Sequence, residues 1–377
     1  MIIGLKFITN GVIRMDTMQL ELIFDERVNW TKREENNLIA ELTRLKGRGN
    51  RYTYVDVLYS RSDYKIIVKL SYPRYFFGNN AYLVKSAEEC KEVQRAFVGE
   101  LRDRNRFKGL KAIKVARIDI PFTFLMLDNR EFSDYSNIYK IMGEVFINKF
   151  TKTRPKAISD LITSKKETII FTDSAVSSAY NKKVIIYNQY LNLKGKLDDH
   201  SEAITSREFT RTEKTFPDLR KRMRIEFSTR VRRKAFTLNE FKREDLFKHY
   251  SKVAKNFLLE KLLDERTIED VYNVQIDKLI KRLKNIDTKI NYENFILTEF
   301  KDIYSYEVLR TALSETIKND NTFKNAITRV RRVLKQEEEE YDGIIILDVT
   351  REIKEIRKLI KTYFKKSRET TNNSYPF

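Results

Sequence analysis

The segment KVIIYNQY, Lys183–Tyr190, predicts a strand that carries two tyrosines. Residues 184–186 are β-branched and follow a turn-like run of asparagine and lysine, which is typical of a short strand that leaves a turn. Side chains alternate between the two faces of a strand, so Tyr187 and Tyr190 are expected on opposite faces. A strand tyrosine often does no more than pack against a neighbour, and the rest of the sequence must decide between packing and chemistry.

Two further segments alternate between apolar and polar residues in the same way. In VARIDIPFTF, Val115–Phe124, Asp119 lies on the polar face, and in RMRIEFSTRV, Arg222–Val231, Glu226 does. Such alternation is typical of half-buried strands in an antiparallel sheet. Together with the helical segments, it predicts an α+β fold: a central, mainly antiparallel sheet with one polar face and helices on the other, followed by an all-helical C-terminal part.

The spacing of apolar residues changes near Thr237 from the period of strands to that of helices. We therefore expect a strand-rich domain at residues 1–236 and a helical domain at residues 237–377. A single long helix is expected at Thr237–Leu263. Gly195–Arg220 is polar and rich in charge, which predicts a long connection beside the strands.

Two of the expected C-terminal helices form a basic pair. Ser305–Asp320 and Asn321–Lys335 have the proportions of two helices joined by a tight turn, and the second carries Arg329, Arg331 and Arg332. A helix-turn-helix that reads DNA has this form, and so does any basic helical hairpin. Both interpretations stay open from the sequence.

Net charge is the most informative global property of the chain. Its 74 lysines and arginines outnumber its 54 acidic residues, giving a net charge of +20. Such an excess attracts polyanions, and DNA is the first partner to consider because neutralised phosphates release their counterions. An anionic membrane is the weaker alternative, because no polybasic block lies beside an apolar helical face.

Cysteine usage and hydropathy indicate the cellular compartment in which the protein is expected. A single cysteine, Cys90, excludes an internal disulfide and fits a reducing compartment. The first residues are interrupted by charge too early for a signal peptide, and no apolar run reaches the ~20 residues of a membrane span. We expect a soluble, cytoplasmic protein that does not bind membranes.

The polar faces of the three strands bring a phenol and two carboxylates together among basic residues. Asp119, Tyr187 and Glu226 are the candidates for chemistry. Paired carboxylates are suitable ligands for Mg²⁺ or Mn²⁺ that also contacts a phosphate. A phenol with a pKa of ~10 is a poor nucleophile near neutral pH unless a cation or a base assists it.

These segments resemble a known family in their order and spacing. The sequence ARID at Ala116–Asp119 is followed by TIIFTDSAVSS and KKVIIYNQY within Thr168–Tyr190, and then by MRIEFSTR at Met223–Arg230. The trio is similar to rolling-circle replication initiators of the plasmid Rep and filamentous-phage gene II type, which lack a His-hydrophobe-His motif. The resemblance covers roughly Asp16–Phe236 and implies that the polar face is catalytic.

The resemblance implies a metal-dependent enzyme that nicks single-stranded or hairpin origin DNA. It would form a 5′-phosphotyrosine and leave a 3′-hydroxyl for polymerase, with host helicase or polymerase as possible partners. Tyr187 would be the nucleophile, assisted by Lys183, and Asp119 and Glu226 would hold Mg²⁺ or Mn²⁺. The residues expected to contact DNA are Arg117, Lys182, Arg222, Arg224, Arg230, Arg329, Arg331 and Arg332.

The chain departs from the family pattern after the tyrosine, where Asn188 and Gln189 replace the usual acid and lysine. Lys182, Lys183 or Lys194 would have to supply the missing cation. A DNA-binding replication or regulatory protein without nuclease activity is the alternative that the charge also fits. A tyrosine recombinase is disfavoured, because its site relies on histidine and the chain has only 2 histidines, in no recognisable motif.

Overall fold

The protein is seen in a computed structural model of all 377 residues. It describes residues 6–7, 15–25, 30–61, 65–84, 86–126, 168–172, 182–198, 205–231, 235–257, 264–284 and 306–340, and the single positions 259, 295, 354, 357, 358 and 361.

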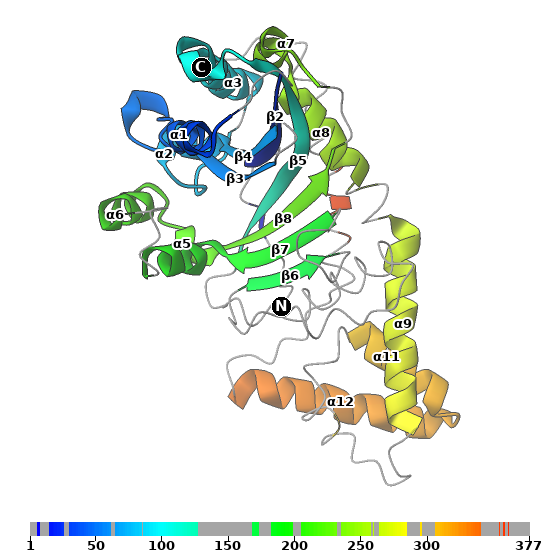
Figure 1. The fold of residues 1–377 in the computed structure, drawn as a ribbon. Coiled ribbons are helices and arrows are strands. Elements are labelled where there is room, and N and C mark those ends of the chain that lie inside the picture. Colours follow the sequence, from blue (N-terminus) through cyan, green and yellow to red (C-terminus); the bar gives the residue numbers. More distant parts are fainter. Residues whose placement is uncertain are drawn as a thin grey trace, which may run out of the picture. The chain divides into compact units, whose positions relative to one another are not determined.

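The chain divides into two compact units, whose elements are labelled in Figure 1. The sheet unit comprises Lys6–Asp128, Lys156–Asn256 and Lys366–Phe377. The helical unit comprises Met1–Leu5, Asn129–Pro155 and Phe257–Lys365.

The described part of the sheet unit is built on an antiparallel sheet of eight strands. Their order is β3-β4-β2-β5-β8-β7-β6, and β1 pairs with the far end of β5. The strands are β1 (Lys6–Phe7), β2 (Thr17–Phe24), β3 (Val55–Arg61), β4 (Lys65–Ser71), β5 (Leu110–Leu125), β6 (Thr168–Thr172), β7 (Lys182–Asn188) and β8 (Arg222–Arg230). The predicted α+β class is confirmed.

Register explains why one face of this sheet is apolar. Residues that pair directly across an antiparallel ladder point to the same side. Phe227 on β8 pairs with Ile120 on the neighbouring strand β5 and with Val184 on the other neighbour, β7. All three side chains are buried. Burying a side chain of this size contributes roughly 1.5–3 kcal/mol, so this face is the core of the unit.

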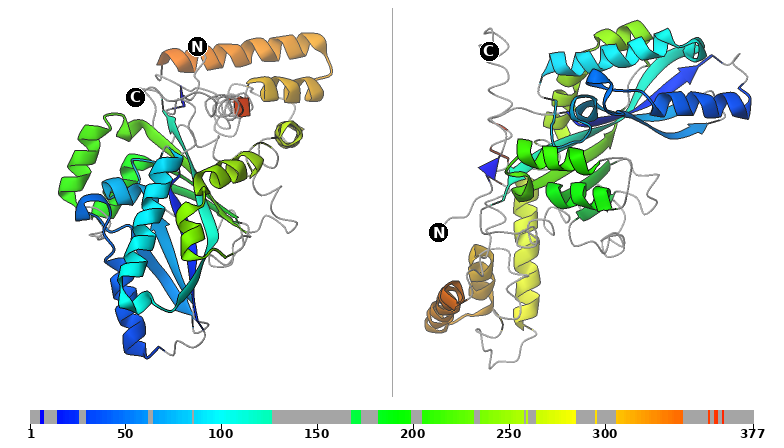
Figure 2. Two further views of the ribbon diagram at one scale, coloured as in Figure 1. Left: turned by 90° about the horizontal axis from the view of Figure 1, so that it is seen from above. Right: turned by 90° about the vertical axis from the view of Figure 1, so that its left-hand side faces the viewer.

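Helices cover the apolar face (Figure 2). They are α3 (Ala87–Asp103), α7 (Leu238–Arg243) and α8 (Leu246–Phe257). Gln94 of α3 donates to the carbonyl of Phe241 over 2.7 Å, and Tyr250 of α8 donates to the carbonyl of Asp119 over 2.6 Å. Because α7 and most of α8 belong to the sheet unit, that unit extends past residue 236, where the sequence suggested a boundary.

The other described α-helices of the sheet unit are labelled in Figure 1. They are α1 (Lys32–Thr43), α2 (Tyr72–Phe77), α5 (Gln189–Asp198) and α6 (Ser206–Thr215). The prediction of a long connection over Gly195–Arg220 is wrong, because this segment contains the end of α5 and all of α6. Thr205 forms a capping box with Glu208 that starts α6 within this polar stretch.

Two helix boundaries also differ from the prediction. The single helix expected at Thr237–Leu263 is divided, because Glu244 is extended (φ −60°, ψ 132°) and ends α7. Asp245 then accepts from the amide of Lys248 over 2.8 Å and starts α8. The strand expected to reach Tyr190 ends at Asn188, so Tyr190 lies in α5 instead.

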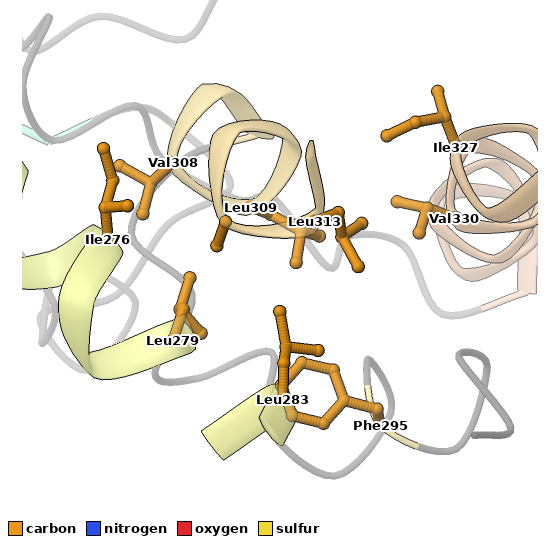
Figure 3. Packing of buried hydrophobic residues seen from close by; sticks show 10 residues of the cluster. Ile276, Leu279, Leu283, Phe295, Val308, Leu309, Leu313, Ile327 and Val330 are labelled. Atoms are coloured by element: carbon orange, nitrogen blue, oxygen red, sulfur yellow. The ribbon is translucent and has the colours of Figure 1, made fainter. Parts of the chain in front are cut away.

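The helical unit contains α9 (Glu265–Lys284), α11 (Tyr306–Thr316) and α12 (Asp320–Glu340). Figure 3 shows their shared core, in which Leu279 of α9, Leu309 of α11 and Val330 of α12 are buried. The two adjacent helices expected from the sequence are present as α11 and α12. Within the described residues, no helix is long and apolar enough to cross a membrane. The sequence also predicts a helix at Ser133–Phe150 and a turn at 173–181, and both lie outside the described residues.

Candidate functional site

The three strands of the sequence motifs are neighbours in the sheet, in the order β5, β8, β7. Tyr187 pairs with Arg224, and Ile185 with Glu226, across β7 and β8. Asp119 pairs with Ser228, two residues from Glu226 along β8. The predicted trio of Asp119, Tyr187 and Glu226 therefore lies on one face, opposite the apolar core. Asp119 is in the same row as Lys183, which also pairs with Ser228, so it lies nearer to Glu226 than to Tyr187.

Tyr187 is hydrogen-bonded at the centre of this face. Its hydroxyl donates to Oε2 of Glu226 over 3.2 Å and accepts from Nδ2 of Asn80 over 3.3 Å. Only 4% of the residue is exposed. Burial, and next the negative charge of Glu226, raise the pKa of the phenol, while Arg224 acts in the opposite direction. The phenol is therefore neutral near pH 7 and needs a base before it can act as a nucleophile.

Glu226 has the properties that such a base requires. Burial, followed by the charges of Asp16 and Asp119, raises the pKa of its carboxyl from 4.5 to about 7, against the opposing effects of Lys69 and Arg224. A base is most effective when its pKa lies near the working pH. The carboxyl that accepts the Tyr187 hydrogen bond is thus able to take up a proton close to neutrality.

Asp119 is fixed on both its side chain and its backbone. The hydroxyl of Thr17 donates to its Oδ2, and Tyr250 donates to its carbonyl. The side chain is buried among polar neighbours. Its position beside β2 explains how an acidic residue is tolerated at the centre of the sheet.

Asp16 is a third carboxylate, which sequence reasoning missed. It precedes β2, is 2% exposed, and lies 3.8 Å from Nη1 of Arg224. Its Oδ1 is buried and has no hydrogen-bond partner within the described residues. Burial raises its pKa. The available signal was an acidic residue directly before an alternating strand, which is too common a pattern to single out.

Arg224 is internal and holds the site together. It is 0% exposed, donates from Nε to Thr123 over 3.2 Å and from Nη1 to the carbonyl of Asn80 over 2.7 Å. Asp16 lies near the same guanidinium. The expectation that Arg224 contacts DNA is corrected, because its side chain has no surface to offer a phosphate.

Arg222 requires the same correction. It is 6% exposed, donates to Oδ1 of Asp218 over 2.7 Å, and its guanidinium lies 4.6 Å from the centre of the Phe216 ring. Arg117 is also buried, and its Nη1 is 3.5 Å from the hydroxyl of Ser228. Of the arginines predicted on this face, Arg230 at the end of β8 is the exposed one.

Lys183 is on the same face as Tyr187 but not beside it. The two residues are four positions apart on one strand, which corresponds to roughly 13 Å at ~3.3 Å a residue. Burial lowers the pKa of Lys183, while Glu226 and Asp119 oppose the shift. Its predicted role as the cation next to the phenol is therefore corrected. Lys182 is the first residue of β7 and is partly exposed.

A cleft of about 770 Å³ opens over Tyr187 and Glu226. Asp16 and Ile185 also line its floor. Basic side chains line its walls: Arg44, Lys46, Lys69, Arg74 and Lys196. Burial alone would lower the pKa of Lys69, but the carboxylates of Asp119, Glu226 and Asp16 outweigh it and raise the pKa. Asp56 also lines the cleft and pairs with Arg74 over 2.7 Å, so the walls stay cationic through the other basic side chains, above an acidic floor.

The predicted metal ligands can be tested against this arrangement. Among the described residues, no group of three or more His, Cys, Asp or Glu side chains is arranged to hold a metal ion. Two carboxylates still suffice for Mg²⁺ when substrate phosphate and water complete its shell. The mutual repulsion that raises the pKa of Glu226 and the unbonded oxygen of Asp16 fit a site that gains from a bound cation.

The departures after the tyrosine have local structural functions. Asn188 accepts from the amide of Leu191 over 3.1 Å, which caps the first turn of α5, and donates to the carbonyl of Arg220 over 3.0 Å. Gln189 is 0% exposed and donates to the carbonyl of Asn80 over 3.0 Å. Both side chains hold the end of β7 in place next to Tyr187.

The predicted DNA contacts of the helical unit lie on α12. Arg329, Arg331 and Arg332 are exposed. Nε of Arg331 donates to the hydroxyl of Tyr306 on α11 over 2.9 Å. The helices leave all three guanidinium groups at the surface.

Comparison with known proteins returned no matching family model, no matching curated protein and no matching solved structure.

Proposed function

We propose that the protein is a replication initiator that nicks single-stranded origin DNA through Tyr187. The observation that carries the proposal is the hydrogen bond from the Tyr187 hydroxyl to a carboxyl whose pKa is about 7, at the floor of a cleft with cationic walls. A phenol, an adjacent base and nearby cations are the groups that attack on a phosphodiester requires.

In the proposed step, the Tyr187 oxygen attacks the scissile phosphorus and its proton passes to Glu226. The bond between phosphorus and the 3′-oxygen breaks, and that oxygen takes a proton from solvent to become a free 3′-hydroxyl. The 5′-phosphate remains on Tyr187. Lys69 and Lys196, which line the cleft, balance the charge of the phosphate.

Mg²⁺ or Mn²⁺ is the cofactor that the carboxylates would hold. The resemblance implied Asp119 and Glu226 as its ligands. Because Glu226 is the proposed base, we assign the ion to Asp119 and Asp16, and Oδ1 of Asp16 is buried with no hydrogen-bond partner among the described residues. A bound divalent cation would polarise the phosphate and stabilise the charge that develops on it.

The helical unit has a separate proposed function. Arg329, Arg331 and Arg332 would contact DNA and help to choose the origin. Host helicase or polymerase would act on the strand that carries the new 3′-hydroxyl. These activities belong to the cytoplasm, where we propose that the protein works.

The test is direct detection of the covalent product. The full chain is incubated with labelled single-stranded DNA and Mg²⁺ or Mn²⁺, and a protein-linked band is sought on a denaturing gel. Mass spectrometry of the digested band should place the nucleotide on Tyr187. A nucleotide on another residue, or cleavage without any adduct, contradicts the proposal.

DNA binding without cleavage is the second candidate function. The observation in its favour is that Tyr187 is 4% exposed and that burial raises the pKa of its phenol. In that case the cationic walls bind the backbone and the Tyr187 hydrogen bonds only stabilise the sheet. Specific DNA binding with no adduct in either metal would establish this alternative.

A further inference from the structure

A second cavity, of about 270 Å³, lies in the sheet unit. It is formed by the segment after α1, the end of α2, and α6 with the residue that follows it. Its walls combine arginines with aromatic rings: Arg48, Arg51, Arg211, Tyr52, Phe77 and Phe216. None of these residues lines the cleft of Tyr187.

The walls of this cavity are fixed by tight packing. Gly78 has a φ of 76°, and a Cβ on it would lie 2.5 Å from the ring of Tyr52. Gly47 is packed so closely that a Cβ would lie 2.3 Å from the carbonyl oxygen of Tyr75, and its amide donates to the carbonyl of Tyr52 over 2.7 Å. Side chains larger than hydrogen are excluded at both positions. The Tyr52 ring thus packs directly against Gly78, and its backbone is bonded to Gly47.

A side-chain hydrogen bond joins α6 to the same wall. Nδ2 of Asn79 donates to the hydroxyl of Thr212 over 2.8 Å, and both residues are buried. Arg211, next to Thr212, is exposed, and its Nη1 lies 3.5 Å from the hydroxyl of Tyr52. The two sides of the cavity are therefore held at a set spacing.

The charge of the cavity is positive. Glu208 is the acidic residue in its lining, and its carboxylate already accepts two hydrogen bonds from Thr205 that cap α6. Arg48 has a long contact of 3.8 Å to Glu92, and both side chains remain exposed. Arg51 and Arg211 are exposed at the cavity. A phosphate is the group that such guanidinium side chains recognise.

The aromatic rings supply a different kind of contact. Tyr52, Phe77 and Phe216 are partly exposed. Phe77 stacks on Tyr82 with ring centres 4.4 Å apart and Arg222 lies over Phe216, so a ligand would meet the sides of these rings that line the cavity. Rings next to arginines form the stacking platforms on which single-stranded nucleic acid places its bases. A volume of about 270 Å³ is below the ~300–1,000 Å³ of pockets for drug-sized ligands, which fits one base.

We propose that this cavity, the Arg51–Arg211 pocket, binds one nucleotide of single-stranded DNA. The base stacks on the aromatic rings and the phosphate contacts the arginines. The pocket and the cleft of Tyr187 share a wall, because Tyr52 and Phe77 line the pocket while their neighbours Thr53 and Gly78 line the cleft. The inference rests on the proposed single-stranded DNA substrate, and it adds a position that holds this strand beside the scissile phosphate.

Binding of a fluorescent oligonucleotide to the full chain tests the pocket. The double variant Arg51→Glu, Arg211→Glu should bind at least ~10-fold more weakly than wild type, since each reversal removes and opposes a phosphate contact. The control is Arg33→Glu, Arg243→Glu, which makes the same change of charge at exposed residues that line neither cavity. Equal weakening in both double variants would overturn the proposal.

Photocrosslinking provides a second test that does not depend on the folding of a variant. An oligonucleotide with one 5-iodouracil is irradiated with the full-length Tyr187→Phe protein, which keeps the strand intact. Crosslinks within residues 48–52, 76–77 or 211–216 are expected. Crosslinks only elsewhere overturn the pocket. Deoxythymidine monophosphate is then added as a competitor. If the pocket binds a strand, only millimolar amounts should reduce the crosslinks. Loss of the crosslinks at much lower amounts would mean that the pocket prefers a free nucleotide, which overturns the proposed ligand.

The outcome is separate from that of the nicking proposal. Loss of binding in the pocket variant without any adduct in wild type would support the pocket and reject the nuclease. An adduct on Tyr187 together with unchanged DNA binding in the pocket variant would support the nuclease and reject the pocket.

Discussion

The hydroxyl of Tyr187 on β7 donates to Oε2 of Glu226 on β8 over 3.2 Å, and the pKa of that carboxyl is raised to about 7. The hydrogen bond joins the group proposed to attack to the group proposed to take its proton. Since burial also raises the pKa of the phenol, the reaction depends on the ionised form of Glu226.

Replacing Tyr187 with phenylalanine should abolish both nicking and the covalent adduct. DNA affinity should hardly change, because one neutral hydroxyl contributes little beside many phosphate contacts. Tyr190→Phe is the matched control, since Tyr190 lies in α5 and packs against Phe209 with ring centres 5.5 Å apart. It should nick normally and lose at most ~1 kcal/mol of stability. A protein-linked band that persists in Tyr187→Phe would remove Tyr187 as the nucleophile.

The rate of nicking should rise with pH as Glu226 ionises, because the base must be ionised to accept the phenol proton, and the midpoint should lie at or below about 7 because a divalent cation bound nearby favours the ionised carboxyl. Glu226→Gln should remove this rise along with nearly all of the activity. Single-turnover rates measured between pH 5.5 and 8.5 provide the check. A profile that is flat in the wild type would exclude Glu226 as the base.

The free energy of unfolding should respond to pH in the opposite direction. The folded pKa of Glu226 exceeds its ordinary 4.5, so the folded state binds more protons and stability falls as pH rises from about 4.5 to about 7. The loss is on the order of 2 kcal/mol. Glu226→Gln should show a smaller loss in urea titrations at pH 5 and 7.5. Glu88→Gln, on the exposed side of α3, should follow the wild type.

Arg224 should be far more important for stability than Arg230, although both lie on β8. Arg224→Met leaves Asp16 buried without its cation. It also removes the hydrogen bonds that Arg224 donates to the Thr123 hydroxyl and to the Asn80 carbonyl, so the free energy of unfolding should fall by about 3 kcal/mol. Arg230→Met at the exposed strand end should change stability by less than ~0.5 kcal/mol. Chemical denaturation of both variants checks this, and equal effects would mean that Arg224 is not a structural residue.

Strand alternation was sufficient to predict the face shared by Asp119, Tyr187 and Glu226. Local periodicity carries this information because one face of the sheet is buried. The order of the strands and the pairing of Asp119 with Ser228 and of Ile185 with Glu226 were not predicted, because alternation gives the face of each residue but not its partner.

Other parts of the site depend on contacts that no local pattern contains. Asp16 joins the site only because β2 lies beside β5. The place where β7 ends is decided by hydrogen bonds from Asn188 to Arg220 and from Gln189 to Asn80, residues that are distant in sequence. The burial of Arg224 likewise depends on three segments that meet around its guanidinium. Alternation places a residue on a polar face but does not indicate whether that face is open to solvent.

In the helical unit, Arg329, Arg331 and Arg332 are exposed on α12. If α12 reads the origin, replacing all three arginines with alanine should reduce the preference for origin over random duplex DNA by at least ~10-fold. Binding to random DNA should weaken far less. The full chain is the appropriate protein, because a fragment that ends near residue 236 would lose Phe241 and Tyr250, which are both 0% exposed.

A matched triple variant controls for charge alone. Lys281, Lys284 and Lys318 are exposed in the same unit, and changing them to alanine removes the same charge. Competition binding at fixed salt should leave the origin preference of this control intact. If both triple variants weaken origin and random DNA to the same extent, α12 supplies only nonspecific attraction and the helix-turn-helix interpretation fails. Loss of preference in the arginine variant alone would assign origin recognition to α12.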